Sequence, residues 1–243
     1  MIEQVKKQCT ILRLHGFNEN AELRANEAQS SSQTYLDFLQ ILLEDELLHR
    51  KNAKAKRLIS KAKFRHDCDL EDWDDSYERG INKTKMKQLS LLGFHKNMEN
   101  LIILGRTGEG KTHLAMSLGK RLCAEGITTH FYSVNLFFEE VNAAKASGKY
   151  LNLIKKLSRT PVIILDDFGL RAYTHEEATI LMDILEDRYR KGTVMVTSQV
   201  DPRGWSKLFE DPVIAEAIND RLTKPSMTIK LKGGSYRDKL KVS

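Results

Sequence analysis

Cysteine is scarce in this sequence, with three residues in a chain of 243: Cys9, Cys68 and Cys123. Their odd number and wide spacing favour neither a disulfide framework nor a metal knuckle. No apolar run reaches the roughly 18 residues of a membrane span, and Lys, Arg and His interrupt the short apolar runs of the N-terminal stretch MIEQVKKQCTILRLHGF. Neither a membrane span nor a signal peptide is predicted. We therefore expect a soluble protein of the reducing cytoplasm with no membrane partner.

The overall composition is that of a globular chain. Hydrophobic residues make up 41% of the sequence, which is enough to bury a core, and the length corresponds to one or two domains. The net charge of +6 and the pI of about 9.1 are compatible with a polyanionic partner but do not establish one. The distribution of charge along the chain is therefore more informative than its sum.

The N-terminal part predicts a helix. Leucines recur at spacings of three and four within residues 34–48, as an amphipathic helix requires: Leu36, Leu39, Leu43 and Leu47. Thr34, followed three residues later by Asp37, resembles a capping box at the start of this helix.

The next stretch, residues 49–66, is strongly basic. It carries eight lysines or arginines, no acidic residue, and neither Gly nor Pro to stop a helix. It is either the solvated face of a helix or a surface that contacts phosphates. Residues 67–78 then reverse the sign of the charge, with Trp73 and Tyr77 as the expected apolar anchors of an acidic linker.

After residue 97 short apolar strands alternate with helical patterns, which is typical of a parallel α/β sheet. The expected strands are residues 100–104, 129–134, 161–167 and 193–199, and the expected helices are residues 111–126, 135–148 and 176–192. We accordingly expect a small helical N-terminal domain over residues 1–78 and a P-loop NTPase domain, a parallel sheet flanked by helices, over residues 79–243.

The most specific motif follows the first of these strands. Gly105, Gly110, Lys111 and Thr112 fit the phosphate-binding pattern G-x-x-x-x-G-K-[ST] between a strand and a helix. Backbone amides of the loop surround a phosphate, the lysine reaches the β- and γ-phosphates, and the threonine hydroxyl is a ligand for Mg²⁺. The alternative is a glycine-rich turn without a ligand. The nucleotide-binding residues are then Gly105, Arg106, Thr107, Gly108, Glu109, Gly110, Lys111, Thr112 and His113.

A P-loop needs a carboxylate at the end of a neighbouring strand to hold the metal, and VIILDD provides two. Asp166 is the expected metal-side residue. Asp167 is expected to point to the other face of the strand end and to polarise the attacking water. The alternative is that both acids merely cap the strand.

Two further polar positions lie downstream. The last expected strand ends in Thr197, Ser198 and Gln199, where a polar side chain could sense the γ-phosphate. Arg221 could reach into the site of a neighbouring subunit to stabilise the transferring phosphoryl group. From spacing alone, an intramolecular pair of Arg221 with Asp220 or another acid is the favoured alternative.

Taken together, these motifs resemble the IstB-type ATPases, helper proteins of bacterial transposition, and more distantly the DnaC-type helicase loaders of the AAA+ class. The resemblance covers nearly the whole chain, through YLDFLQILLEDELLHRKNAKAKRLISKAKF, NLIILGRTGEGKTHLAMSLG, VIILDDFG, TVMVTSQ, INDRL and GGSYRDK. The KTHLA and SYR elements are the most telling, because generic P-loop kinases do not share them.

The resemblance implies an AAA+ ATPase that binds ATP with Mg²⁺, assembles as a homo-oligomer on duplex DNA, hydrolyses ATP slowly and presents a target site to a transposase. It makes Lys111 and Thr112 the Walker A residues, Asp166 and Asp167 the Walker B pair, and Gln199 the sensor-1 residue. It also favours Arg221 as an arginine finger. The basic helix becomes the preferred DNA-contacting surface, through Arg50, Lys51, Lys54, Lys56, Arg57 and Lys61.

The sequence departs from the family pattern at the phosphate loop. Arg106 stands where Pro is common and Glu109 where a small residue is common, so an acid beside the phosphates could weaken ATP binding. Asp167 has a shorter reach to water than a glutamate, which favours slow turnover. Three other functions stay open: a helicase loader, a P-loop kinase of a small metabolite, and a DNA-binding module with a vestigial nucleotide site.

Overall fold

The computed structural model describes residues 2–74 and 80–234. The chain divides into two compact units, Met1–Arg57 with Ala124–Gly126 and Leu58–Cys123 with Ile127–Ser243. We call them the N-terminal unit and the ATPase unit. The division falls within one helix after Arg57, whereas the sequence placed a domain boundary after residue 78. The difference has a packing cause, since Cys68 and Trp73 are buried in the core of the ATPase unit.

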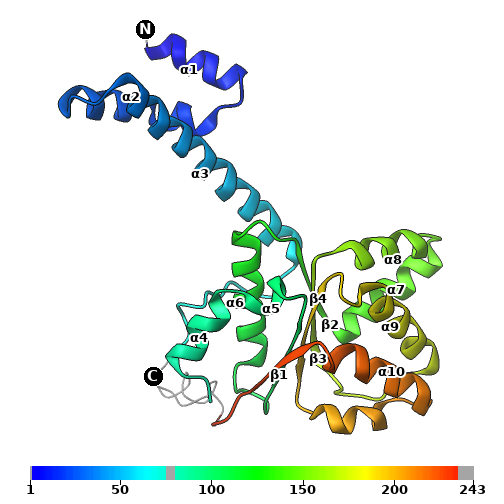
Figure 1. The fold of residues 1–243 in the computed structure, drawn as a ribbon. Helices are drawn as coiled ribbons and strands as arrows, with labels where there is room; N and C mark the ends of the chain where they lie inside the picture. The colour runs from blue at the N-terminus through cyan, green and yellow to red at the C-terminus, as the bar shows by residue number, and fades with distance from the viewer. Residues whose placement is uncertain (1, 75–79, 235–243) are drawn as a thin grey trace. The chain divides into compact units, whose positions relative to one another are not determined.

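The ATPase unit is built on a five-stranded parallel sheet in the order β2-β3-β4-β1-β5 (Figure 1). The strands are β1 (Asn100–Leu104), β2 (Thr129–Ser133), β3 (Val162–Phe168), β4 (Thr193–Ser198) and β5 (Ser226–Lys230). The first four confirm the strands expected from the sequence, with ends that differ by a residue or so. The sequence analysis did not predict β5, in which Ile229 is buried and the other four residues are exposed or half-buried.

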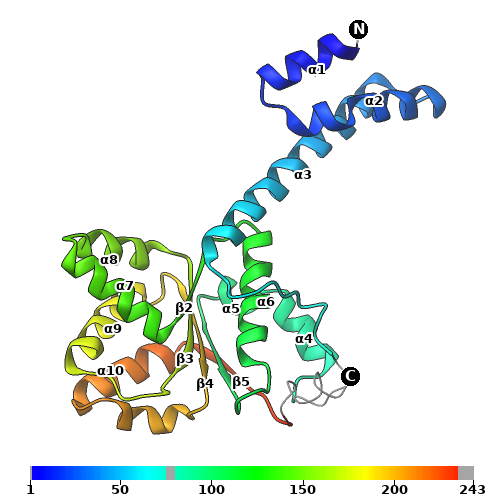
Figure 2. The same cartoon turned by 180° about the vertical axis from the view of Figure 1, so that it is seen from behind.

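Helices cover both faces of this sheet. They are α4 (Lys83–Ser90), α5 (Gly93–Lys96), α6 (Lys111–Ala124), α7 (Val134–Ala146), α8 (Tyr150–Arg159), α9 (His175–Arg188), the 3₁₀ helix η1 (Pro202–Leu208) and α10 (Pro212–Thr223). Helices α4, α5 and α6 lie on one face and α7 to α10 on the other (Figures 1 and 2). The three-layer α/β architecture expected from the sequence is confirmed.

Alternation along the strands produces the two apolar layers. In β1, Leu101 and Ile103 join the layer beneath α6, whereas Ile102 and Leu104 join the layer beneath α7 to α10. Every residue of β1 is buried, because a central parallel strand is covered on both sides. Because these strands are parallel, the carboxyl ends of β1, β3 and β4 lie at one edge of the sheet.

The N-terminal unit consists of α1 (Ile2–Ile11), α2 (His15–Ser30) and most of α3 (Tyr35–Ala62). Helix α3 joins the leucine-rich and basic stretches into one helix, as expected, and the Thr34–Asp37 capping contacts are present at its start. It ends at Ala62, four residues before the end of the basic stretch, and Lys63 adopts a left-handed conformation with φ of 62°. The turn lets Phe64 pack on α6, where its ring lies so close to Gly119 that a Cβ there would clash with it.

A buried carboxylate joins α2 to α3. Glu46 accepts hydrogen bonds from the amides of Gly16 (2.7 Å) and Phe17 (3.4 Å) and pairs with Arg50 (2.6 Å). Burial opposes its charge, but the Arg50 and amide hydrogen bonds outweigh burial and hold the pKa of Glu46 below its usual range. Gly16 is required here, since a Cβ would lie 2.6 Å from backbone atoms of α3.

The leucine row of α3 is exposed in the single chain. Leu36 and Leu47 are 77% and 67% exposed, and Leu39 and Leu43 also face solvent. The sequence correctly predicted an amphipathic helix, but among the described residues no neighbouring element covers this row. Within the described residues, no helix has both the length and the apolar character needed to cross a membrane.

Of the two expected linker anchors, Trp73 is buried in the ATPase unit. Tyr77 lies outside the described residues, as does the SYR element near the C-terminus.

Candidate nucleotide-binding site

The phosphate loop connects β1 to α6. Gly108 and Gly110 have φ of 85° and 93°, a region that glycine adopts without strain. Lys111 begins α6, and the Leu114 amide bonds to the Gly110 carbonyl (2.9 Å), which closes the first helical turn. The loop thus directs its amides and the positive end of α6 toward the same edge of the sheet.

Two charged side chains of the loop are folded against its own backbone. Lys111 is 6% exposed and donates to the Arg106 carbonyl (2.9 Å). Glu109 is 3% exposed and accepts from the Arg106 amide (2.6 Å). An acid is therefore accommodated beneath the loop, where it occupies an amide that could otherwise face a phosphate. Gly105 leaves room for it, because a Cβ at that position would lie 2.5 Å from the Glu109 carboxylate.

Asp166 lies at the end of β3, fully buried beside the loop. Its Oδ1 accepts hydrogen bonds from the hydroxyls of Thr112 (2.8 Å) and Thr197 (2.6 Å). Burial raises the pKa of Asp166, because a carboxylate loses its hydration there. Its Oδ2 accepts no hydrogen bond among the described residues.

This arrangement fits a magnesium ion. The Thr112 hydroxyl and the unsatisfied Asp166 Oδ2 are hard oxygen ligands, which Mg²⁺ prefers, and they come from the two elements that the P-loop pattern requires. A divalent cation would also offset the cost of a charged Asp166 in a buried position.

Asp167 departs from the orientation expected of it. Its φ is 64°, and the register between β3 and β4 shifts between Leu165 and Phe168. This bulge breaks the strand alternation, so that the carboxylates of Asp166 and Asp167 face one cation, Arg65, and do not point to opposite faces. The Asp167 amide donates to the Thr197 hydroxyl (3.0 Å), which holds the bulge in place.

Arg65 is a site residue that the sequence analysis did not single out. Its guanidinium lies 3.5 Å from Asp166 Oδ2 and 3.8 Å from Asp167 Oδ2, and it stacks over the Phe131 ring at 5.6 Å. In the sequence it is one of eight basic residues in a run. Its position after the turn at Lys63 separates it from the basic residues on α3.

The end of β4 contributes two contacts. Gln199, just after β4, accepts a hydrogen bond from the Thr107 hydroxyl of the phosphate loop (3.0 Å). The expectation that it senses the γ-phosphate stays a prediction. Thr197 was noted in the sequence only as part of a polar strand end, but it is the β4 residue that bonds to Asp166. A cavity of about 440 Å³ opens beside the loop, lined among others by Gly105, Arg106, Glu109 and Gln199.

His113 lies in the first turn of α6, with its ring beside those of His66 (6.4 Å between centroids) and Trp73 (6.3 Å). It therefore faces the segment that follows α3, in contrast to Thr112, which faces Asp166. The expectation that His113 belongs to the nucleotide contacts stays a prediction.

Arg221 lies in the last turn of α10, and its carbonyl accepts a hydrogen bond from the Asn100 side chain (2.9 Å). Asn100 begins β1, whereas the phosphate loop follows the end of that strand. It pairs with Glu186 (2.5 Å) and its guanidinium lies 4.8 Å from the centre of the Tyr189 ring. Asp220, the first partner considered from the sequence, pairs with Lys224 instead. Within one chain Arg221 is thus a member of an intramolecular ion pair.

The predicted DNA-contacting residues divide by their position on α3. Arg50, Lys54 and Arg57 are exposed and lie on one face, because they are spaced by four and three residues. We call these three residues the basic row. Arg50 pairs with Glu46 (2.6 Å) and Lys51 pairs with Glu125 (3.4 Å). Lys56 is two residues from Lys54 and one from Arg57, so it lies on a different side of the helix. Lys61 belongs to the ATPase unit.

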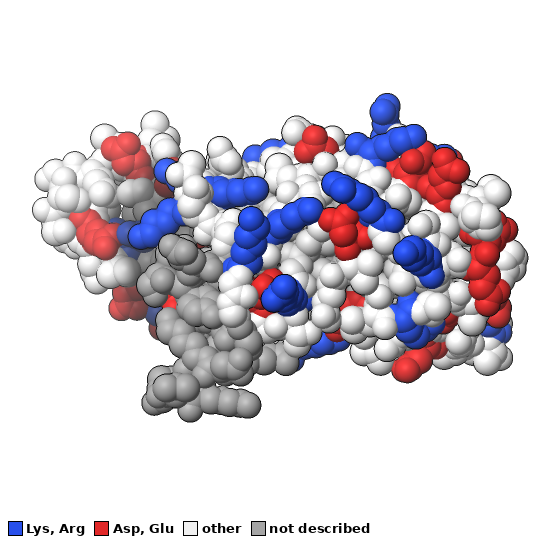
Figure 3. Space-filling view, turned by 90° about the horizontal axis from the view of Figure 1, so that it is seen from below, with Lys and Arg blue, Asp and Glu red and all other residues white. Residues whose placement is uncertain are grey.

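Basic residues of the ATPase unit are more dispersed. On the face shown in Figure 3, lysines and arginines are interspersed with acidic side chains. That face therefore presents charges of both signs, in contrast to the basic row of α3.

The family model for IstB-like ATP binding proteins matches residues 7–243 of the chain. The chain belongs to this family. An ATP-binding protein of insertion sequence IS21 from Pseudomonas aeruginosa is 31% identical over 230 residues, covering 95% of this chain and 87% of that protein. An ATP-binding protein in an insertion sequence of Mycobacterium tuberculosis is 30% identical over 227 residues, covering 93% and 90%. The resemblance inferred from the motifs is confirmed.

Solved structures confirm the AAA+ P-loop fold of this IstB-like chain. The crystal structure of DnaI superposes with a TM-score of 0.58 at 19% identity, covering 73% of this chain and 94% of DnaI. The DnaC helicase loader gives 0.56 at 18% identity, covering 70% and 100%. DnaA from Aquifex aeolicus gives 0.58 at 16% identity, covering 74% and 57%. These identities establish the fold, and they carry no more than the fold.

Proposed function

We propose that this protein is an ATPase that assembles on duplex DNA and assists the transposase of an insertion sequence in selecting its target. Two observations support the proposal. Thr112 of the P-loop donates a hydrogen bond to the buried Asp166, and relatives in the family are named as ATP-binding proteins of insertion sequences. Its parts are a nucleotide site, an interface between subunits and a surface for DNA.

The nucleotide site would bind ATP through the loop amides and Lys111, whose ammonium exchanges the Arg106 carbonyl for phosphate oxygens. Thr112 and Asp166 would hold Mg²⁺, which offsets phosphate charge when bound. Asp167 accepts a proton from the attacking water as the new bond to the γ-phosphorus forms and the bond to ADP breaks. Gln199, which accepts a hydrogen bond from Thr107, would orient that water or the γ-phosphate.

Arg65 is a positioning residue in this scheme. It lies within 4 Å of both carboxylates, so it offsets their mutual repulsion and fixes the distance between them. Because the same Asp166 oxygen serves the metal, Arg65 competes for it and favours slow hydrolysis.

Arg221 would act across the interface between subunits. It lies on α10 and is 30% exposed, so a neighbouring phosphate could replace Glu186 as its partner. A bidentate contact to the γ-phosphate would connect ATP binding in one subunit to assembly with the next.

The DNA surface would be the basic row of α3, supplemented by Lys51, Lys56 and Lys61. Contacts of this kind read the phosphate backbone and not the bases. When ATP joins subunits, several basic rows act on one duplex, and the affinity rises by multivalency.

The second candidate is a helicase loader, and it is favoured by the fold likeness to DnaI and DnaC. In that case the N-terminal unit would bind a replicative helicase in place of a duplex. A metabolite kinase has no support from the family match.

Sedimentation velocity with a long duplex and ATP, ADP or no nucleotide tests the proposal. With the duplex present, we expect large complexes when ATP is added and none with ADP or without nucleotide. We expect the Arg221→Ala protein to remain a small species that still binds ATP. Arg221→Lys is the matched control, because lysine keeps the positive charge but cannot make the bidentate contact of a guanidinium. If wild-type protein stays monomeric with ATP, Mg²⁺ and DNA, the assembly mechanism is wrong; if it binds a helicase and no duplex, the loader is the better assignment.

A further inference from the structure

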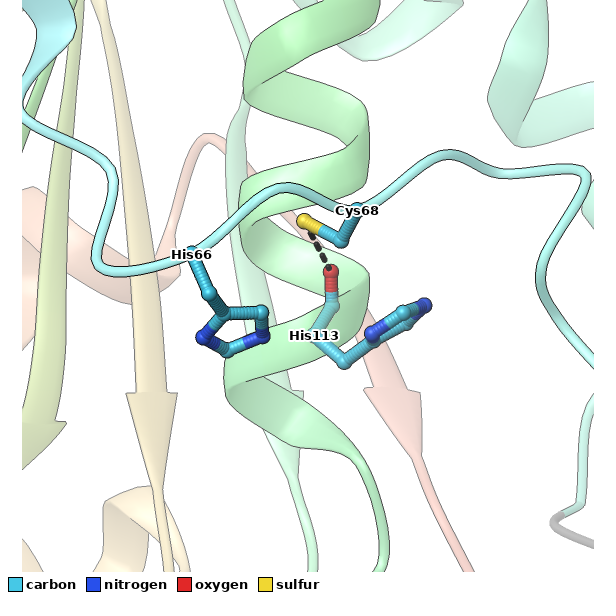
Figure 4. Close-up of side chains that lie close together, drawn as sticks. All are labelled: His66, Cys68 and His113. Atoms are coloured by element: carbon cyan, nitrogen blue, oxygen red, sulfur yellow. Dashed lines mark hydrogen bonds between the residues drawn. The ribbon is translucent and has the colours of Figure 1, made fainter.

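Three potential metal ligands meet on the face of α6 that carries His113 and Ser117. His66 and Cys68 come from the segment after α3, and His113 comes from the first turn of α6 (Figure 4). One ligand atom of each residue lies within 4.8 Å of the other two. The spacing of the cysteines along the chain indicated no metal site, since His113 is far from the other two in sequence.

These groups form a chemically consistent set. Two imidazoles and a thiolate are preferred ligands of Zn²⁺, with metal–nitrogen distances of about 2.0–2.1 Å and a metal–sulfur distance of about 2.3 Å. Tetrahedral bonds of that length place ligand atoms roughly 3.3–3.6 Å apart. The observed separation therefore needs a closing movement on the order of 1 Å, which a rotation of the exposed His66 side chain can supply.

The surrounding contacts hold the two ligand-bearing segments together. The Cys68 thiol lies 4.0 Å from the His113 carbonyl, and Ser117, one turn further along α6, donates to the Asp69 carbonyl (3.3 Å). Lys120 pairs with Asp67 (2.7 Å) and Asp69 (2.8 Å), on either side of Cys68. The face of α6 that carries His113 thus fixes the segment by contacts independent of any metal.

Access and burial also suit a metal with one open position. Cys68 is 3% exposed, whereas His66 is exposed and His113 is half-buried. An ion can enter from the His66 side, and solvent can complete the tetrahedron. On binding, the thiol loses its proton to solvent, and the thiolate charge is offset by the ion.

We propose that His66, Cys68 and His113 bind one Zn²⁺ ion. The site is separate from the magnesium ligands, but it is connected to them through the chain: His66 follows Arg65, and His113 follows Thr112. A bound ion would cross-link these two segments and restrict Arg65 to its position beside Asp166 and Asp167. The packing of the segment after α3 on the start of α6 would then depend on the metal.

Cobalt titration of the full chain tests this site directly. A thiolate-bound tetrahedral Co²⁺ gives a sulfur-to-metal charge-transfer band and intense visible bands, and we expect one equivalent to bind and to be displaced by Zn²⁺. Cys68→Ser should abolish the charge-transfer band, and His66→Ala and His113→Asn should each weaken binding by more than the roughly 10- to 100-fold of an outer contact. Cys123→Ser, which removes the other cysteine of this unit, is the matched control and should keep the band.

Two further variants keep the test decisive. Lys111→Ala removes a nucleotide contact and should leave cobalt binding unchanged, which separates this site from the nucleotide site. Thermal unfolding of the wild type should shift upward with Zn²⁺ relative to EDTA, and the shift should vanish in His66→Ala, whose exposed side chain is not required for folding. Absence of a thiolate band in the wild type, or its persistence in Cys68→Ser, would overturn the proposal.

Discussion

The two units of the chain are stabilised in different ways. In the ATPase unit, the fully buried strands β1 and β4 lie between two apolar layers. In the N-terminal unit, the buried side chains include Cys9, Ala21 and Leu42, while ion pairs such as Arg24–Asp45 (2.8 Å) join α2 to α3. The ATPase unit has a large apolar core, whereas the N-terminal unit exposes both a leucine row and a basic row.

The exposed leucines give this difference an energetic meaning. Complete burial of one leucine contributes about 1.5–3 kcal/mol, so a partner that covers the row of Leu36, Leu39, Leu43 and Leu47 gains several such increments. A second copy of the N-terminal unit is the simplest partner under the proposed assembly. We infer that the ATPase unit binds and hydrolyses ATP, and that the N-terminal unit supplies the surfaces that contact DNA and a second subunit.

The largest expected effect concerns the nucleotide site. Lys111→Ala should weaken ATP binding about 100-fold, because the variant has no ammonium to make a charge-assisted hydrogen bond to the phosphates, while hydrogen exchange in the N-terminal unit stays unchanged. Isothermal titration measures the affinity. Lys145→Ala on α7, which removes a surface pair with Glu176, is the control. Unaltered ATP binding and assembly in Lys111→Ala would indicate a vestigial site.

The N-terminal unit should depend on one buried carboxylate. Glu46→Ala leaves the buried Gly16 amide without its acceptor and should cost about 1–3 kcal/mol. We expect faster hydrogen exchange in α2 and an unchanged ATP affinity. Glu44→Ala on the exposed side of α3 is the comparison, and equal exchange in the two variants would refute the role assigned to Glu46.

The basic row can be tested by salt dependence. Removing Lys54 and Arg57 together should reduce the slope of log affinity against log salt by roughly 0.9 for each DNA phosphate that the variant no longer neutralises, with little effect on ATP binding. Lys56→Ala, on a different side of α3, should change the slope less. If Lys56→Ala has the larger effect, the DNA lies on a different face of the helix.

Acidification should weaken the two units in different pH ranges. Burial lowers the pKa of His95 and His130 in the ATPase unit below the ordinary value of 6.5, so the unfolded chain binds protons first and the stability falls below pH 6.5. The pKa of Glu46 is lowered from 4.5, so its stabilisation persists above that value and is lost at more acidic pH. Hydrogen exchange against pH would show the order, and His95→Asn should flatten the first decline. The opposite order would contradict these shifts.

Local patterns in the sequence predicted the parts of the site that are contiguous. The P-loop lies at the expected position because a strand, a glycine-rich turn and a helix follow one another in the chain. Asp166 was predicted for the same reason, since it ends a continuous apolar strand. The basic helix was predicted from its charge, but its stop at Ala62 was not, because packing of Phe64 on α6 ends it without Gly or Pro.

The remaining features depend on contacts between distant segments. Arg65 lies 3.5 Å from Asp166 in the fold but far from it in the sequence, and no spacing rule connects the two positions. The bulge at Asp167 arises from its bond to Thr197 of another strand. His66, Cys68 and His113 likewise meet only in the fold.

The most direct test of the coupling between the two units is the affinity of the full chain for a duplex, measured by fluorescence anisotropy with a slowly hydrolysed ATP analogue, with ADP and without nucleotide. The account predicts tight, salt-sensitive binding with the ATP analogue that Lys111→Ala abolishes. Equal affinity in all three nucleotide conditions would contradict it.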